Sequence, residues 1–444
     1  MRIFILLIVI FTASQTIAQP LIDSSNTNWS THFQLTVISQ GHPAFHAAYS
    51  GQNSLSNDAE NALSVTSTLY LGRKLWKGAA VYFNPEIAGG KGISSAKGIA
   101  GFTNGETFRI GDPSPALYVA RAYIQQMIPL RGSIYEELEN DVNQVKEKLP
   151  SSRITITAGK FAISDFFDDN KYSHDPRTQF LNWSLMSNGA WDYPANTRGY
   201  TVGLVVELIK PTWAFRVAAV QVPKVANGPT MDPEIFKANS ETVEFEKSFF
   251  INKKAGDIRL LAFHNVSQAP SYKYAIAAAA LGDSNSLPVF TGNYEWKKYG
   301  GEKYGFAISI SQDISENTGA FLRASWNDGK TATWAFTEID KSINAGININ
   351  GKSWKRSDDN VGIAFVMNGL SNDHRDFLKA GLSGFIIGDG QLNYAAESIA
   401  EVYYSARIFN NIFLTGDYQF VNNPAYNKDR GPVNVFSVRL HVGF

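Results

Sequence analysis

The chain has 444 residues, with 40 Lys and Arg against 40 Asp and Glu, no Cys, and 13% aromatic residues. This balance of charge argues against a nucleic-acid-binding protein and against a pore built as a one-sign funnel for phosphate. The absence of cysteine excludes a disulfide scaffold and a lipoprotein anchor.

The N-terminal residues have the pattern of a secretory signal peptide. Arg2 gives a positive start, residues 3–11 are apolar, and residues 16–18 end in a small side chain before Gln19. We expect residues 1–18 to be cleaved, which leaves residues 19–444 as the mature domain. A membrane anchor is the weaker alternative because the apolar run is too short to span a bilayer, and no later apolar run reaches about 18 residues.

Segments of alternating apolar and polar residues then recur along the chain and predict sixteen β-strands. Alternation of this kind gives a strand one apolar face and one polar face. We expect strands near residues 32–40, 62–76, 79–88, 116–129, 153–163, 198–209, 213–222, 242–252, 257–266, 304–314, 319–327, 331–350, 361–369, 398–409, 412–421 and 433–444. An even number places both ends of a closed barrel on the same side of the membrane.

The connections between these strands alternate in length. Short turns rich in Gly, Pro or Asn lie at residues 77–78, 210–212, 315–318 and 410–411. Long polar segments lie at residues 89–115, 164–197, 223–241 and 371–393. Short turns at one end and long loops at the other are typical of porins, whereas a periplasmic β-sandwich does not sort its loops by length.

One connection departs from this pattern and reads as a helix. Residues 136–149 follow the fourth predicted strand and carry apolar residues at helical spacing, namely Leu138, Val142, Val145 and Leu149. Acidic residues occupy the first turn, and Pro150 follows the last. We interpret the segment as a short helix that rests on the periplasmic rim of the barrel, with a gate as the less favoured alternative.

The last strand shows the alternation most clearly. Its apolar face comprises Phe436, Val438, Leu440, Val442 and Phe444, and its polar face comprises Ser437, Arg439 and His441. An unpaired apolar edge strand invites aggregation in a soluble protein. A barrel in a bilayer avoids this problem, because its last strand pairs with its first and its apolar face meets lipid. We therefore expect residues 433–444 to pair with residues 32–40.

Two groups of short motifs resemble a known family. The first group is AGKFAISDFFDDN at residues 158–170, DPR at 175–177 and QFLNW at 179–183. The second is EVYY at 401–404, DYQF at 417–420, NPAYN at 423–427, DRGP at 429–432 and RLH at 439–441. Together they resemble the carbohydrate-selective porin family, OprB type, of Gram-negative outer membranes.

The resemblance implies a sixteen-stranded transmembrane antiparallel barrel of the bacterial outer membrane that passes sugars by diffusion. Its partners would be a carbohydrate substrate and outer-membrane lipid, and both a monomer and a homotrimer remain open. The family often has a longer segment before its first strand. Here about ten residues separate Gln19 from the first alternating run, so we do not expect an N-terminal helical plug.

Strand parity and one long loop supply the candidate pore residues. The lumen-facing charges expected from parity are Arg121, Arg216, Arg259, Arg323, Glu401, Arg407, Asp417 and Arg439. Residues 164–197 are the segment most suited to fold inward and narrow a wide barrel. The candidate substrate-binding residues are Asp165, Asp168, Asn170, Arg177, Trp183, Arg121, Glu401 and Arg439.

These residue types suit a neutral sugar. Carboxylate, amide and guanidinium groups form hydrogen bonds with sugar hydroxyls, and tryptophan can stack on the apolar face of a sugar ring.

Two alternatives stay open for the loop at residues 164–197. One is a calcium site formed by Asp165, Asp168 and Asp169, although their spacing is not that of an EF-hand. The other is a solvated loop without a role in binding.

The sequence offers little for catalysis. Its seven His residues are scattered, and we find no metal-ligand spacing and no phosphate-binding glycine loop. We therefore expect no enzyme and no cofactor, and predict a passive porin for mono- and oligosaccharides. The competing hypotheses are a general or differently selective porin, and a blocked barrel with a structural or adhesive role.

Overall fold

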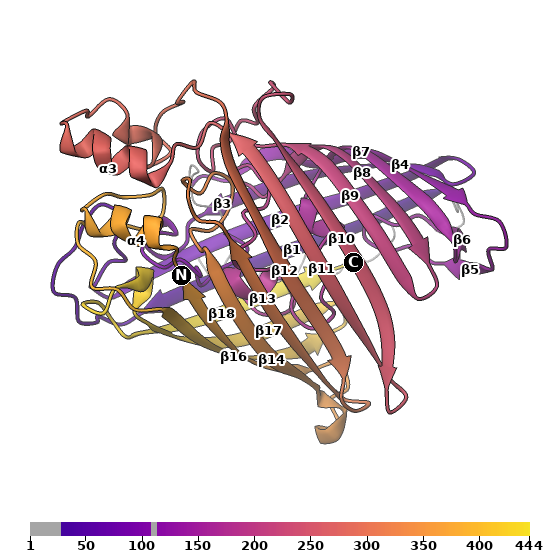
Figure 1. Cartoon of the computed structure of the whole chain (residues 1–444). Coiled ribbons are helices and arrows are strands. Elements are labelled where there is room, and N and C mark those ends of the chain that lie inside the picture. Colours follow the sequence, from indigo (N-terminus) through magenta and orange to yellow (C-terminus); the bar gives the residue numbers. More distant parts are fainter. Residues whose placement is uncertain (1–27, 108–112) are drawn as a thin grey trace.

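The computed structural model describes residues 28–107 and 113–444, which form a closed barrel of antiparallel strands (Figure 1). Sixteen strands make up the barrel, and the last strand lies beside the first. The predicted all-β barrel and its number of strands are therefore confirmed. The predicted signal peptide, residues 1–18, lies outside the described residues.

The barrel strands follow the chain in order. They are β1 (Trp29–His42), β2 (Glu60–Trp76), β3 (Ala79–Gly90), β4 (Ala116–Pro129), β7 (Arg153–Phe161), β8 (Thr201–Lys210), β9 (Trp213–Gln221), β10 (Asn239–Ile251), β11 (Lys254–Ser267), β12 (Gly301–Asp313), β13 (Thr318–Asn327), β14 (Lys341–Asn350), β15 (Asn360–Gly369), β16 (Glu397–Phe409), β17 (Ile412–Asn422) and β18 (Val433–Gly443). A separate hairpin contains β5 (Tyr135–Leu138) and β6 (Glu147–Pro150).

Within the described residues, helical segments occur only in the connections between strands. The α-helices are α2 (Trp183–Met186), α3 (Tyr272–Ala280) and α4 (Asn372–Lys379), and the 3₁₀ turns are η1 (Ile93–Ser95), η2 (Ile163–Asp165), η3 (Leu287–Val289), η4 (Gly351–Trp354) and η5 (Pro424–Tyr426). Helices α3 and α4 pack together beyond the barrel, where the rings of Tyr272 and His374 stack at 4.3 Å (Figure 1). Within the described residues, no helix is long and apolar enough to cross a membrane.

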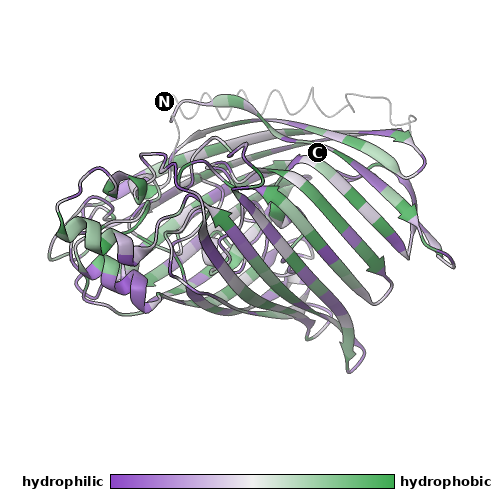
Figure 2. Cartoon of the chain, turned by 45° about the horizontal axis from the view of Figure 1, so that its top comes forward, coloured by the Kyte–Doolittle hydropathy of each residue, from purple (hydrophilic) through white to green (hydrophobic). Residues whose placement is uncertain are grey.

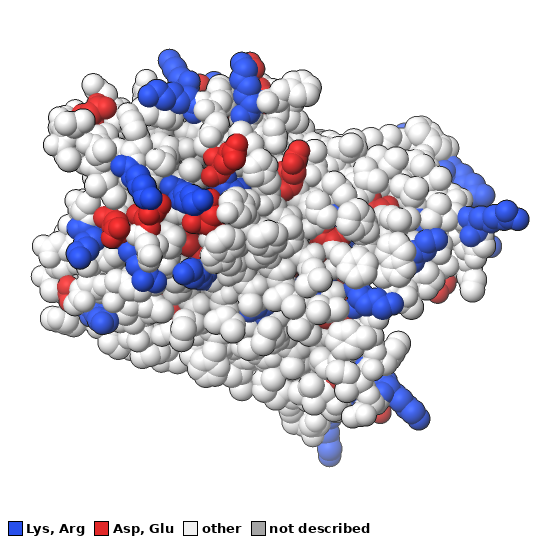
Figure 3. All heavy atoms as spheres, viewed as in Figure 1, with Lys and Arg blue, Asp and Glu red and all other residues white. Residues whose placement is uncertain are grey.

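Each barrel strand presents an apolar face outward and a polar face inward. In β18, Phe436 and Val438 are 56% and 52% exposed, whereas Ser437 and Arg439 are buried in the lumen. Figure 2 shows this alternation along the strands. In the face drawn in Figure 3, charged side chains gather over the loops at one end and at the turn tips, with few on the band between. An apolar outer band of this kind suits hydrocarbon.

The barrel closes where the sequence predicts. β18 pairs with β1 in an antiparallel register that runs from Gln34 opposite Gly443 to Gly41 opposite Phe436. Beyond these pairs, the Phe33 and Phe444 backbones exchange two hydrogen bonds, of 3.0 and 2.9 Å. No edge strand therefore remains in the barrel sheet.

The predicted helix at residues 136–149 is wrong. The segment is the β5–β6 hairpin, in which Tyr135 pairs with Pro150 and Leu138 pairs with Glu147. The apolar residues do not share one helix face. Val145 is buried, and the chain reverses near Asn143, which has φ 53°. A left-handed residue of this kind marks a turn and not a helix.

The predicted strand at residues 331–350 is correct only in its second half. β14 begins at Lys341, and the preceding residues form a loop. The N–H groups of Trp334, Ala335 and Phe336 donate to the Asp192 carboxylate, at 2.9 to 3.1 Å. These N–H groups therefore find their partner in another loop and not in a neighbouring strand.

Candidate functional site: the constricted lumen

The connection between β7 and β8, residues 162–200, folds into the barrel and not over its rim. Lumen-facing side chains of the wall hold it in place. Arg323 of β13 donates through Nε to the Asp168 carboxylate at 2.9 Å, and both side chains are 1% exposed. Glu401 of β16 accepts the Leu181 N–H at 2.5 Å. Each buried charge thus has a partner, as burial requires.

The same loop is held against β17 and β18. Arg439 donates through Nη1 to the carbonyls of Pro176 and Gln179, each at 2.7 Å. The side-chain amide of Asn182 donates to the Gln419 side chain at 3.0 Å. These contacts hold the loop against strands β13 to β18 on one side of the lumen.

The loop reaches from the long-loop end to the short-turn end of the barrel. Lys171 Nζ lies 2.6 Å from the carboxylate of Asp313, the last residue of β12, just before a short turn. The Asn170 amide donates to the Ile310 carbonyl at 3.2 Å. The loop therefore runs through most of the depth of the barrel, so a solute has to pass alongside it.

An aromatic cluster stiffens the loop. The Trp183 ring lies 5.1 Å from the Phe336 ring and 5.4 Å from the Phe102 ring, and Tyr193 stacks on Phe336 at 4.1 Å. Trp183 Nε1 donates to the Asn104 carbonyl at 3.0 Å. Three connections thus share one packed core inside the barrel, which favours a fixed constriction.

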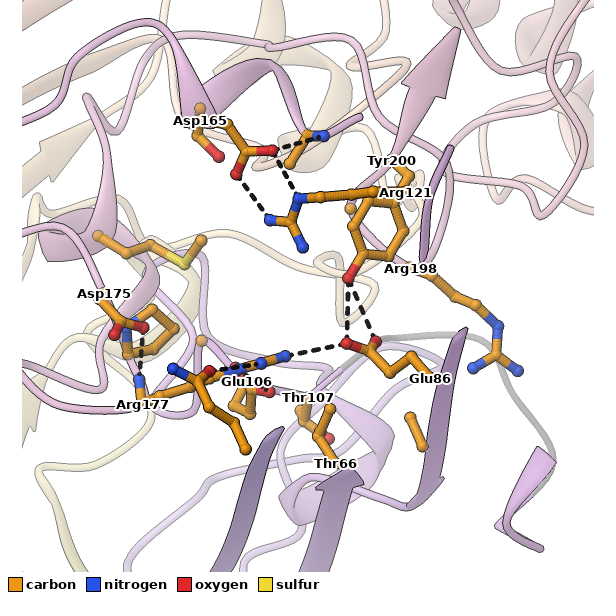
Figure 4. Close-up of a pocket in the computed structure, with 18 of the residues that line it drawn as sticks. Thr66, Glu86, Glu106, Thr107, Arg121, Asp165, Asp175, Arg177, Arg198 and Tyr200 are labelled. Atoms are coloured by element: carbon orange, nitrogen blue, oxygen red, sulfur yellow. Dashed lines mark hydrogen bonds and ion pairs between the residues drawn. The ribbon is translucent and has the colours of Figure 1, made fainter. Parts of the chain in front are cut away.

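A cavity of about 480 Å³ remains between this filling and the wall (Figure 4). Its lining comes from β1 to β4, from residues 105–107, from the inward loop and from residues 141–143 of the β5–β6 connection, with Asn227 and Phe336 from two further connections. Five carboxylates and three guanidinium groups line it, namely Glu86, Glu106, Asp141, Asp165 and Asp175, with Arg121, Arg177 and Arg198. The cavity is therefore polar and of mixed sign.

Arg177 is the most connected group of the cavity. Its Nε donates to Glu106 at 2.8 Å, and its Nη2 donates to Glu86 at 3.1 Å. Its Nη1 donates to side-chain oxygens of Tyr70, Thr68 and Gln34, at 2.7, 3.1 and 3.2 Å. These contacts hold the planar guanidinium in one orientation across strands β1 to β3.

A second cluster faces Arg177 across the cavity. Arg121 of β4 makes a bidentate pair with Asp165, with contacts of 2.7 and 2.6 Å. Its guanidinium carbon lies 5.4 Å from the centre of the Tyr200 ring. The Tyr200 hydroxyl donates to Glu86, with oxygen distances of 3.2 and 3.3 Å (Figure 4). Glu86 thereby links the two arginine clusters.

Two carboxylates on the loops titrate differently. Burial raises the pKa of Glu106 to about 7, although Arg177 opposes the shift. Burial would also raise the pKa of Asp175, but the Arg177 charge and the Arg177 backbone N–H hold that pKa below its usual value. Near pH 7, therefore, Glu106 is protonated in part of the molecules, whereas Asp175 stays ionised.

Four of the eight predicted site residues line the cavity: Arg121, Asp165, Arg177 and Trp183. The other four, Asp168, Asn170, Glu401 and Arg439, join the inward loop to the wall. Of the charges placed in the lumen by parity, Arg407 lies near a short turn and pairs with Asp358 at 2.8 Å.

Sequence reasoning missed several cavity residues. Glu86 is buried on the lumen face of β3, and Tyr118 of β4 donates to it. Strand parity would have placed Glu86 inward, because it lies two residues from the lumen-facing Asn84. No local signal points to Glu106, because its place depends on how residues 91–107 fold against the loop.

The calcium alternative gains no support from the described residues. Asp165 and Asp168 each pair with a separate arginine. In residues 28–107 and 113–444, no three Asp, Glu, His or Cys side chains are arranged to hold a metal ion.

Residues 52–444 match the model of the family described as carbohydrate-selective porin, OprB family. The high-pH structure of OprB from Pseudomonas putida resembles this chain with a TM-score of 0.69 at 15% sequence identity, and 95% of each chain is covered. The low-pH structure of that protein gives a TM-score of 0.51 at 12% identity, with coverage of 95% of this chain and 94% of that one. Among curated proteins, no significant match was found.

Proposed function

Because this chain belongs to the OprB family of carbohydrate-selective porins, and is thus a β-barrel of the bacterial outer membrane, we propose that it passes neutral mono- and oligosaccharides by passive diffusion. The observation that carries the proposal is the mixed-sign cavity of about 480 Å³ beside the inward loop. Cavities of about 300–1,000 Å³ are the usual size of small-molecule sites.

The chemistry of the cavity matches the chemistry of a sugar. Hydroxyl groups both donate and accept hydrogen bonds, and here they meet carboxylates that accept and guanidinium groups that donate. Tyr70, Tyr118 and Tyr200 add hydroxyls and ring faces to the lining. Because these groups already bond one another, a sugar exchanges bonds with them and does not gain many new ones. Binding stays weak, as conduction requires.

The charges also disfavour the closest anionic relatives of sugars. Among the described residues of the lining, carboxylates outnumber guanidinium groups by five to three. A sugar phosphate therefore meets an excess of like charge, whereas a neutral sugar does not. The proposal needs no covalent step, no cofactor and no energy source, and it assigns no enzymatic role to any residue.

Planar-bilayer recording tests the proposal. Purified protein should form open channels whose current falls when glucose or maltose is added at millimolar concentration. Trp183→Ala and Arg177→Ala should weaken this block while the barrel remains heat-modifiable on gels. Lys379→Ala, at an exposed residue of helix α4, is the matched control and should leave the block unchanged.

Each alternative has its own outcome in the same experiment. Open channels that no sugar blocks would point to a general or differently selective porin. Protein that inserts but carries no current would contradict both porin hypotheses and favour a blocked barrel with a structural role.

A further inference from the structure

The β5–β6 connection enters the lumen from the short-turn end. In an outer-membrane barrel, the short turns face the periplasm. Of the connections at this end, residues 130–152 are the long one, and Figure 1 places β5 and β6 beyond the ends of β4 and β7. The strands of the hairpin stand outside the barrel sheet, but its tip, residues 139–146, turns back toward the pore.

Side-chain contacts hold this tip inside the barrel. The Asn84 amide, buried on the lumen face of β3, donates to the Asn143 side chain at 2.9 Å. Val145 is 4% exposed and packs against Gly72 of β2, where an added Cβ would lie 2.9 Å from the Val145 Cγ2 atom. A larger residue than glycine at position 72 would therefore force the Val145 side chain to shift.

Polar contacts secure the tip on both sides. Ser30 Oγ donates to the Asp141 carbonyl at 3.1 Å, and the Asn140 amide donates to the Trp29 carbonyl at 3.2 Å. Directly after the tip, Glu147 at the start of β6 accepts the Gly78 N–H at 3.1 Å. Strands β1, β2 and β3 and the turn after β2 thus all contact this one segment, which marks it as a fixed part of the wall.

The tip lines the same cavity as the charged clusters. Asp141, Val142 and Asn143 belong to its lining, together with Arg177 and Arg121. The inward loop approaches the cavity from the long-loop end, and the tip approaches from the periplasmic end. A solute that has passed the arginine clusters therefore meets residues 141–143 before it leaves the barrel.

We propose that residues 141–143 form a second, periplasmic constriction that limits the size of solute leaving the pore. Val142 supplies the narrowing side chain, and Asn143, held by Asn84, fixes its position. The constriction is static, because the Asp141 carbonyl contacts β1, the Asn143 side chain contacts β3, and the neighbouring Val145 packs against β2. This inference deepens the proposed function but requires only that the barrel conducts, so it stands or falls separately from the choice of sugar.

Single-cysteine labelling tests the position of Val142. The chain has no natural cysteine, so Val142→Cys carries a unique thiol. A small cationic thiol reagent, added to open channels in a bilayer, should modify this thiol and lower the current by roughly half, because the added group fills the narrow part of the pore. Lys148→Cys is the matched control on the same hairpin, since the Lys148 side chain is 73% exposed and lies outside the cavity lining.

The two variants separate the possible results. Labelling of both variants, with loss of current only in Val142→Cys, supports the constriction. Full labelling of Val142→Cys without loss of current, or no labelling from either side of the open channel, would overturn it.

A shortened hairpin provides the second test. Replacement of residues 139–146 by Asn-Gly keeps β5 and β6 and joins them by a favoured two-residue turn. Conductance should rise by about twofold, and liposomes should admit longer malto-oligosaccharides than wild-type liposomes do. Unchanged conductance and unchanged size limit in a heat-modifiable barrel would overturn the inference. Higher conductance of the shortened variant, together with wild-type channels that no sugar blocks, would retain the constriction and refute only the proposed sugar selectivity.

Discussion

Replacing Arg177 by methionine removes the central cation of the cavity while it keeps much of the side-chain volume. Arg177 donates five hydrogen bonds, two of them to Glu86 and Glu106, and its side chain is only 13% exposed. Loss of one partner of a buried ion pair costs about 3–5 kcal/mol, because the other partner stays buried without compensation. We expect Arg177→Met to lower the stability of the constriction by an amount of this order.

The barrel should nevertheless remain folded. The inward loop keeps its contacts with Arg323, Glu401 and Arg439, none of which involves the Arg177 side chain. The measurable change is therefore in ion selectivity. An ion that passes about 4 Å from the missing charge in water-like surroundings gains or loses about 1 kcal/mol. That energy corresponds to a factor of about five in the ratio of cation to anion permeability.

The assay is the zero-current potential of channels in a bilayer that separates two KCl concentrations. Arg177→Met should shift this potential toward cation preference. Lys379→Met removes one exposed cation outside the cavity and is the control. A zero-current potential that does not change in Arg177→Met, or changes as much in Lys379→Met, would refute the assignment of Arg177 to the pore.

Three further predictions concern pH, the lipid-facing wall and the loop anchors. Burial raises the pKa of Glu106 to about 7, with Glu86 and Asp175 adding to the shift and Arg177 opposing it. Lowering the pH through 7 therefore adds a proton to Glu106 and should reduce the preference of the channel for cations. A pH profile of ion selectivity that shows the same step in Glu106→Gln would contradict this. Val438→Arg, on the exposed face of β18, should lower the free energy of unfolding by about 2–4 kcal/mol, measured by denaturant unfolding from vesicles. Val438→Leu should leave this free energy unchanged. Equal unfolding midpoints for the two variants would argue against lipid contact at this position. Arg323→Met leaves Asp168 buried without its partner and should expose residues 162–200 to protease, at a cost of about 3–5 kcal/mol. Adding Asp168→Asn to Arg323→Met should restore part of the protection against protease. If it does not, the ion pair between Asp168 and Arg323 does not hold the loop.

The barrel follows from short-range information. Whether a residue such as Phe436 or Ser437 faces lipid or lumen depends only on its place in a period of two, which can be read along the chain. The hairpin at residues 135–150 shows where this information fails. Leu138, Val142 and Val145 have helical spacing, but Val145 is needed inside the barrel and Asn143 turns the chain, and neither fact is visible within the segment itself.

The candidate site likewise combines features that the sequence predicts with features that only the tertiary structure decides. Strand parity correctly predicted that Arg323, Glu401 and Arg439 face the lumen, but it could not predict whether each side chain contacts solute or protein. That distinction depends on residues 162–200, which occupy the side of the lumen next to β13 to β18. Arg121 and Arg177 line the cavity because it lies between this loop and strands β1 to β4.

Alternation of side chains was therefore sufficient to predict a membrane barrel, its sixteen strands and the pairing of β18 with β1, because each depends on local periodicity and on the need to satisfy every backbone group in lipid. The path through the barrel was decided only in three dimensions. It depends on which long connections fold inward and which wall charges hold them, and such contacts join residues more than a hundred positions apart, such as Asp168 with Arg323.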